Sequence, residues 1–130
     1  SHTCTISISC ATILNNMSDL KSGKEEFVPS DGWILAASEV EFTEGESVHD
    51  VLQRVCKDAG IQMESSFTPA YNSAYVEGIN NLYEFDCGQL SGWMYNVNGW
   101  FPNYGCSKYT VQDWVYTCNL GKDVGDNSMY

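Results

Sequence analysis

The sequence predicts an α+β domain in which one helix packs across one face of a mixed sheet of four to five strands, with short hairpins beside it. Two observations predict this class. Several short segments alternate apolar and polar residues with the period of two of a half-buried strand, whereas one segment carries an apolar stripe with the period of an α-helix. The length of 130 residues suits a single domain, 1–130.

Two strands are predicted in the first part of the chain. Cys4, Ile6, Ile8 and Cys10 alternate with polar residues and predict the first strand. The polar stretch Asn15–Glu26 is typical of a loop, and a cluster of turn residues at 29–32 precedes a second strand over Trp33–Phe42.

One helix follows. Ser47 is a suitable N-cap, Gly60 stands where a left-handed C-cap is expected, and one apolar stripe lies between them. The stripe consists of Val48, Val51, Leu52, Val55 and Ala59.

The second half returns to β structure. Strands are predicted over Met63–Phe67, Leu82–Phe85, Trp93–Val97 and Trp114–Cys118, and Thr68–Gly78 is predicted to be a tyrosine-rich loop. Asn98-Gly99 indicates a hairpin turn between Val97 and Trp100. The order of two strands, one helix and further strands matches a β-grasp-like plan.

Charge and apolar content limit the partners. Acidic residues outnumber basic ones 17 to 6, and the net charge of −11 argues against nucleic acid and against anionic membrane surfaces. No apolar stretch approaches the ~20 residues that span a bilayer, so no direct membrane insertion is expected. We expect residues 1–3 to be a tag remnant, 119–130 to be a linker or tail, and any signal peptide to have been removed or never included.

The sequence offers no convincing catalytic or metal site. The histidines are His2 and His49, and His49 is expected on the solvent side of the helix with Cys56 on roughly the same face. The paired carboxylates Glu39/Glu41 and Glu84/Asp86 are expected on solvated strand faces. The cysteines contain no C-x-x-C pair, which argues against zinc. No enzyme activity and no required cofactor are therefore expected.

The chain resembles the transcobalamin-like C-terminal domain family, a β-grasp family of extracellular and surface proteins of Gram-positive bacteria. The resemblance rests mainly on Ser-Gly-Trp-Met-Tyr-Asn-Val-Asn-Gly at 91–99 and Tyr-Glu-Phe-Asp-Cys-Gly at 83–88. Gly45-Glu46-Ser47-Val48, Asp50-Val51-Leu52 and Trp114-Val115-Tyr116-Thr117 extend it over nearly the whole chain. One departure is that Asp113 leads directly into Trp114 where relatives carry a Gly-Asp turn and an apolar lead-in, which indicates a shortened strand start or a missing loop.

The resemblance implies a binding role, with a corrinoid such as cobalamin as a possible ligand. Aromatic residues around the predicted hairpin provide candidate contacts for such a ligand, a glycan or a protein. Trp93 and Tyr95 are expected in the core, and the candidate ligand-binding residues are Trp100, Phe101, Tyr104, Tyr71 and Tyr75.

Six cysteines favour an oxidising, extracellular compartment. In a β-grasp sheet the first and last strands are parallel neighbours, so Cys10 is expected near Cys118 and Cys4 near Cys106. Cys4 cannot bridge Cys10, because six residues of strand span ~20 Å whereas bridged Cα atoms lie within about 7 Å. Cys56 is expected to be a buried thiol.

The leading expectation is a non-catalytic binding module of a secreted or cell-surface bacterial protein, next to further domains. The alternative is a structural spacer or adhesion stalk whose aromatic residues only pack. A concave pocket beside the aromatic residues favours the first, and a flat polar surface favours the second.

Overall fold

The computed structural model describes residues 2–43, 46–71, 73–89, 91–97 and 113–119. These residues have the α+β architecture that the sequence predicts, but their strands form two sheets instead of one mixed sheet with short hairpins. In chain order the elements are β1 (His2–Ser9), α1 (Ala11–Leu14), η1 (Met17–Asp19), η2 (Glu25–Phe27), β2 (Trp33–Phe42), α2 (Val48–Ala59), β3 (Met63–Thr68), η3 (Pro69–Tyr71), β4 (Ser73–Ile79), β5 (Leu82–Tyr83), β6 (Gly92–Val97) and β7 (Asp113–Asn119).

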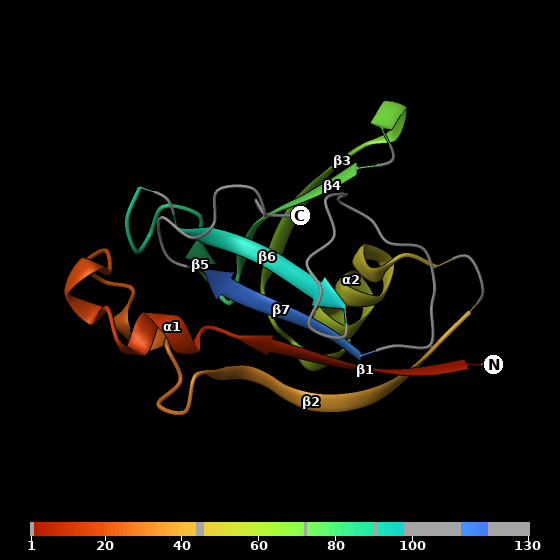
Figure 1. Cartoon of the computed structure of the whole chain (residues 1–130), viewed down its shortest axis with the longest axis horizontal. Helices are drawn as coiled ribbons and strands as arrows, with labels where there is room; N and C mark the ends of the chain where they lie inside the picture. Colours follow the sequence, from red (N-terminus) through yellow and green to blue (C-terminus); the bar gives the residue numbers. More distant parts are fainter. Residues whose placement is uncertain (1, 44–45, 72, 90, 98–112, 120–130) are drawn as a thin grey trace.

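The larger sheet has the order β2-β1-β7-β6 (Figure 1). β1 pairs with β2 antiparallel and with β7 parallel, and β6 pairs with β7 antiparallel. The first and last strands therefore lie side by side at the centre of the sheet, as was expected from the predicted order of elements. The smaller sheet, β3-β4-β5, is antiparallel, and β3 and β4 extend from the body of the molecule as a long hairpin (Figure 1).

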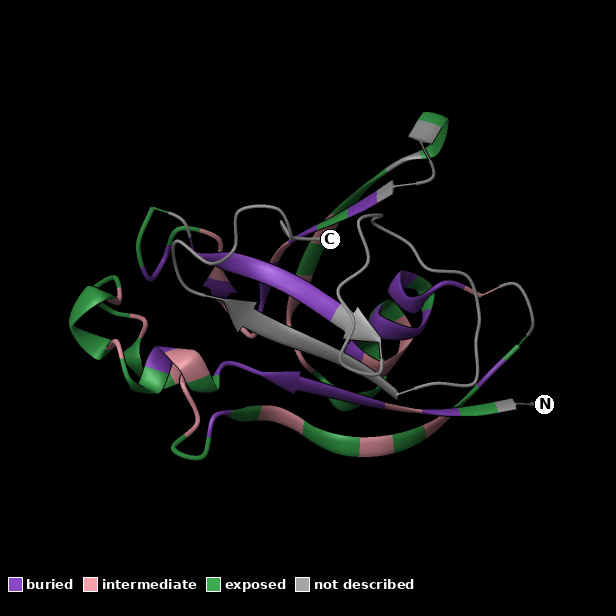
Figure 2. Ribbon diagram, in the orientation of Figure 1, coloured by how far each residue is buried: buried purple, intermediate pink, exposed green. Residues whose placement is uncertain are grey.

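The core lies between the larger sheet, α2 and the base of the smaller sheet. Figure 2 shows the second half of β1, Ile6–Ser9, and residues 92–95 of β6 buried, whereas β2 alternates between exposed and half-buried positions. Trp93 and Tyr95 on β6 are 0% and 1% exposed, which confirms that both are core residues. The indole Nε1 of Trp93 donates to the backbone oxygen of Leu82, 2.8 Å away, and so links the two sheets.

Capping residues at both ends of α2 set the bounds that the sequence predicts. The Ser47 side chain accepts from the backbone N–H of Asp50 at 3.1 Å, and Asp50 accepts in return from the Ser47 N–H at 3.0 Å. This capping box satisfies two amides that the helix cannot satisfy itself. Gly60 ends the helix in the left-handed conformation, with φ 71°. No helix in the described part of the chain is long and apolar enough to cross a membrane.

Three predicted elements differ from the structure. The first strand is confirmed but ends at Ser9, because the chain turns into α1 at Cys10, where the Ile13 N–H donates to the Cys10 oxygen. Thr68–Gly78 is not a loop, since β4 occupies most of it and buries Ala74 and Val76. Asn80 and Asn81, both at positive φ, form the two-residue turn that pairs β4 with β5.

The third difference concerns the segment Leu82–Phe85, of which Leu82 and Tyr83 form the predicted strand. β5 ends at Tyr83, and the chain turns at Glu84 and Phe85. Glu84 and Asp86 therefore do not share a solvated strand face, and Asp86 is buried. Glu39 and Glu41, in contrast, are both exposed on β2 as expected.

The capping box should carry measurable stability. Replacing Ser47 by Ala leaves the Asp50 amide without its acceptor, and we expect the free energy of unfolding to fall by about 1 kcal/mol in urea titrations. Ser66→Ala, at an exposed position on β3, is the matched control and should change stability much less. Equal losses in the two variants would contradict a stabilising role for the box.

Candidate functional site

The most distinctive surface feature is a turn that exposes a phenyl ring, and we call residues 84–89 the Phe85 turn. Phe85 is 60% exposed, the largest exposed fraction among the large apolar side chains of the described residues. Its backbone lies in the left-handed region, with φ 71°. For a bulky residue this conformation is a steric outlier that costs of order 1–3 kcal/mol and persists only where the surroundings hold it.

Backbone and side-chain hydrogen bonds hold this turn from within. The Phe85 N–H donates to the oxygen of Ser91 at 3.1 Å, and the Gly88 N–H donates back to the oxygen of Phe85 at 3.4 Å. The Ser91 hydroxyl accepts from the Cys87 N–H at 3.1 Å and donates to the Gly88 oxygen at 2.8 Å. Hydrogen bonds within the turn, and to Ser91 shortly after it, therefore hold the turn closed.

Asp86 anchors the turn to the loop between α1 and β2. Its carboxylate accepts from the Tyr83 N–H at 2.8 Å and lies 3.2 Å from the ammonium group of Lys24. Its backbone oxygen accepts from the Lys21 N–H at 2.6 Å. Lys24 also donates to the Asn81 oxygen at 2.5 Å, so one lysine joins the β4–β5 turn to the Phe85 turn.

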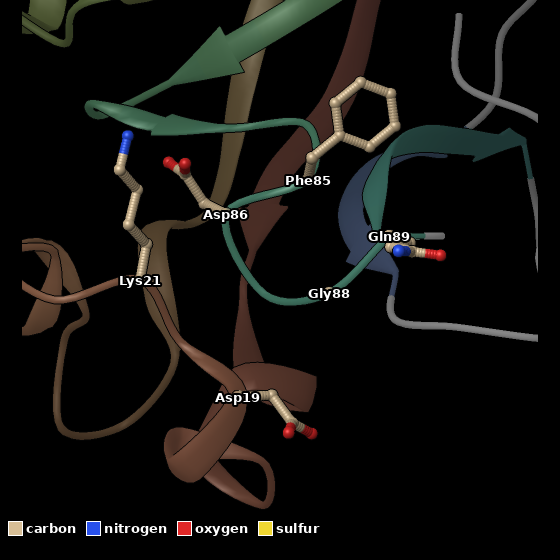
Figure 3. Close-up of a pocket in the computed structure, with 6 residues that line it drawn as sticks. All are labelled: Asp19, Lys21, Phe85, Asp86, Gly88 and Gln89. Atoms are coloured by element: carbon tan, nitrogen blue, oxygen red, sulfur yellow. The ribbon is translucent and has the colours of Figure 1, made fainter.

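An open pocket lies beside the turn, lined by Asp19, Lys21, Phe85, Asp86, Gly88 and Gln89. Figure 3 shows that the side chains of Lys21 and Asp86 point toward each other, whereas the ring of Phe85 points away from both. The polar side of the turn thus faces the preceding loop, and the apolar side is presented outward.

Comparison with known proteins identifies a family to which the chain belongs. A family model described as "Domain of unknown function (DUF4430)" matches residues 45–119, more than half of the chain. The chain belongs to this family. The matched range includes α2, the smaller sheet and the Phe85 turn, whereas Lys21 and Lys24 precede it. No curated protein and no solved structure matches the chain.

Among the five candidate ligand-binding residues, the structure describes the side chain of Tyr75 alone. Tyr75 lies on β4 and is 38% exposed. Partial burial, and then the hydrogen bond with Glu84, raise the pKa of Tyr75. Trp100, Phe101 and Tyr104 lie outside the described residues, as does the predicted Asn98-Gly99 turn, and the Tyr71 side chain is likewise not described. These candidates stay predictions.

Each expected cysteine pair includes one side chain that lies outside the described residues, so the structure tests neither pair. Cys10, Cys56 and Cys87 carry buried thiols, and burial raises the pKa of Cys56 to about 12. Cys106 and the Cys118 side chain lie outside the description, so both predicted bridges stay predictions.

Sequence reasoning missed Phe85 because it read Leu82–Phe85 as a continuous strand. Two signals could have found the turn. The residues Glu84, Asp86 and Gly88 surround a single apolar side chain, and two of the 6 basic residues, Lys21 and Lys24, lie close together in an otherwise acidic chain.

His49 is buried, at 5% exposed, which corrects the expected solvent-side position. Its Nε2 lies 2.8 Å from the Ser65 hydroxyl, and its ring stacks on Phe67 with ring centres 6.5 Å apart. Burial lowers its pKa, and Asp50 opposes that shift. Among the described residues no group of three His, Cys, Asp or Glu side chains could hold a metal.

The buried His49 should make stability depend on pH. Because its pKa in the folded state lies below 6.5, the unfolded chain binds a proton first as the pH falls from 6.5. Stability should therefore decrease through this window until the folded state is protonated too. Urea titrations between about pH 5 and 7 measure it, and His49→Gln should flatten the slope relative to wild type. If stability depends on pH equally in wild type and in His49→Gln, the lowered pKa of His49 is contradicted.

The backbone strain at Phe85 should be visible as a gain in stability when it is released. Phe85→Gly allows the positive φ without penalty, and the ring contributes little burial, so we expect the free energy of unfolding to rise by about 0.5–1 kcal/mol. Phe67→Gly is the matched control, because Phe67 is 46% exposed in a regular strand and glycine should destabilise it. Losses of similar size in both variants would show that the turn is not strained.

Proposed function

We propose that this chain is a non-catalytic binding module of a secreted or cell-surface protein and that it recognises its ligand through the Phe85 turn. The observation that carries the proposal is a 60% exposed phenyl ring on a left-handed backbone. An exposed aromatic ring offers a large apolar contact area to a ligand, and retained strain is concentrated at functional positions.

The rigidity of the turn supports the same role. Hydrogen bonds within the turn and the contacts of Asp86 with Lys21 and Lys24 fix the backbone that carries the ring before any ligand arrives. A contact that is ordered in advance loses less conformational entropy on binding. A ring kept only for packing would instead be expected in the core.

The chemistry of the turn suits a ligand with a flat or ring-shaped apolar face and polar edges. The phenyl ring can stack on such a face, and Gln89, whose amide both donates and accepts, lines the adjoining pocket. A glycan and a corrinoid such as cobalamin both have this character, and the net charge of −11 disfavours polyanions.

The strand order and the cysteine content also support the proposal. The order β2-β1-β7-β6, the parallel pairing of β1 with β7 and the buried face of α2 support a β-grasp assignment. Such a fold is consistent with a relation to the transcobalamin-like domains. The six cysteines support an extracellular location next to other domains of a surface protein.

The test is a titration of the ¹⁵N-labelled chain with cobalamin and with neutral oligosaccharides, followed by amide chemical shifts. We expect saturable shifts at residues 84–89 for one of these ligands. Phe85→Ala should weaken that binding about tenfold or more, since a lost aromatic contact of ~1.4 kcal/mol changes affinity tenfold.

Phe67→Ala removes an equally large exposed ring from the β3–β4 hairpin and should leave the affinity unchanged. Saturable shifts elsewhere that ignore Phe85→Ala would refute recognition by the Phe85 turn. Absence of binding to every ligand tested would favour the structural-spacer alternative.

A further inference from the structure

The parallel pairing of the central strands brings two distant cysteines to neighbouring positions. The register of β1 and β7 pairs Ile8 with Tyr116 and Ser9 with Thr117. Cys10 directly follows Ser9 at the end of β1, and Cys118 follows Thr117 within β7. Neighbouring strands lie about 4.7–4.9 Å apart, within the 4.4–6.8 Å that separates the Cα atoms of bridged cysteines.

The backbone at Cys10 still follows the line of the sheet. Its N–H donates to the oxygen of Gly32 at 2.8 Å, directly beyond the paired residues Ser9 and Trp33 of β1 and β2. Cys10 is also completely buried, at 0% exposed. Cys10 therefore keeps a sheet-like hydrogen bond at the end of β1, at the position from which the chain turns into α1.

We propose that Cys10 and Cys118 form a disulfide in the oxidised protein and that this bridge fixes the loop that supports the Phe85 turn. The first half depends on the register alone. The second half rests on the function proposed for the Phe85 turn.

The coupling follows from what comes after Cys10. Residues 11–28 contain a single helical turn and two short 3₁₀ helices, so they have little regular structure of their own. They hold the Phe85 turn through Lys21 and Lys24, and the Cys87 thiol contacts the Asn16 oxygen at 3.5 Å. Asn80 donates to the Phe27 oxygen at 2.8 Å near the other end of this loop. A bridge at Cys10 tethers the start of the loop.

The chemistry requires an external disulfide oxidant such as oxidised glutathione. The Cys10 or Cys118 thiolate attacks it, one glutathione thiolate leaves, and the second cysteine displaces the other glutathione as the protein S–S bond forms. Two protein thiols are oxidised and one glutathione disulfide is reduced to two thiols. Burial raises the pKa of Cys10 to about 11, so the folded chain offers almost no thiolate there. We therefore expect oxidation to take place during folding, before Cys10 is buried.

The test is oxidative refolding of the full chain in a glutathione buffer, followed by alkylation and non-reducing peptide mapping. We expect the Cys10 peptide to be linked to the Cys118 peptide. Cys10→Ser and Cys118→Ser should each leave the other cysteine open to alkylation, and Cys56→Ser should leave the link intact. Reduction should lower the Tm by roughly 10 °C more in wild type than in Cys10→Ser.

Hydrogen exchange tests the coupling. Amides of residues 84–89 should exchange about tenfold more slowly in the oxidised wild type than in Cys10→Ser. A link of Cys118 to any other cysteine, or no link, overturns the bridge. A Cys10–Cys118 link with unchanged exchange overturns the coupling. Neither result bears on the ligand titration of Phe85→Ala, so the proposed function fails or stands separately.

Discussion

The contact between Lys24 and Asp86 is the constraint on which the candidate site depends. The ammonium and carboxylate groups lie 3.2 Å apart with side chains only 21% and 11% exposed, so removal of either partner would leave a poorly solvated charge. The same lysine bonds the Asn81 oxygen and lies 5.2 Å from the centre of the Tyr83 ring. One charged side chain thus joins the β4–β5 turn, the smaller sheet and the Phe85 turn.

The sheet supplies the frame for this contact. β1 is buried on both faces, since Ser7 and Ser9 are buried together with Ile6 and Ile8. A strand in that position needs neighbours on both edges, and β2 and β7 provide them from opposite ends of the chain. The loop after β1 therefore starts from a fixed point, although it contains little regular structure.

A structural feature could be predicted from the sequence where the residues that cause it lie close together along the chain. The bounds of α2 could be predicted because Ser47, Asp50 and Gly60 act within a few residues of the helix ends. The burial of Asp86 could not be predicted, because its partner Lys24 is far away along the chain. β4 was missed for the same reason, since Tyr75 and Glu77 suggest a polar loop until β3 and β5 are placed beside them.

At two adjacent positions the usual relation between polarity and burial is reversed, because Phe85 is 60% exposed and Asp86 is 9% exposed. Each is unfavourable by itself, since an exposed ring loses its hydrophobic stabilisation and a buried carboxylate loses its hydration. The left-handed backbone at Phe85 belongs to the sharp turn in which the two side chains diverge. The carboxylate recovers part of the loss through Lys24 and the Tyr83 amide, whereas nothing in the described part of the chain compensates the ring. A ligand that covers the ring would supply the missing compensation.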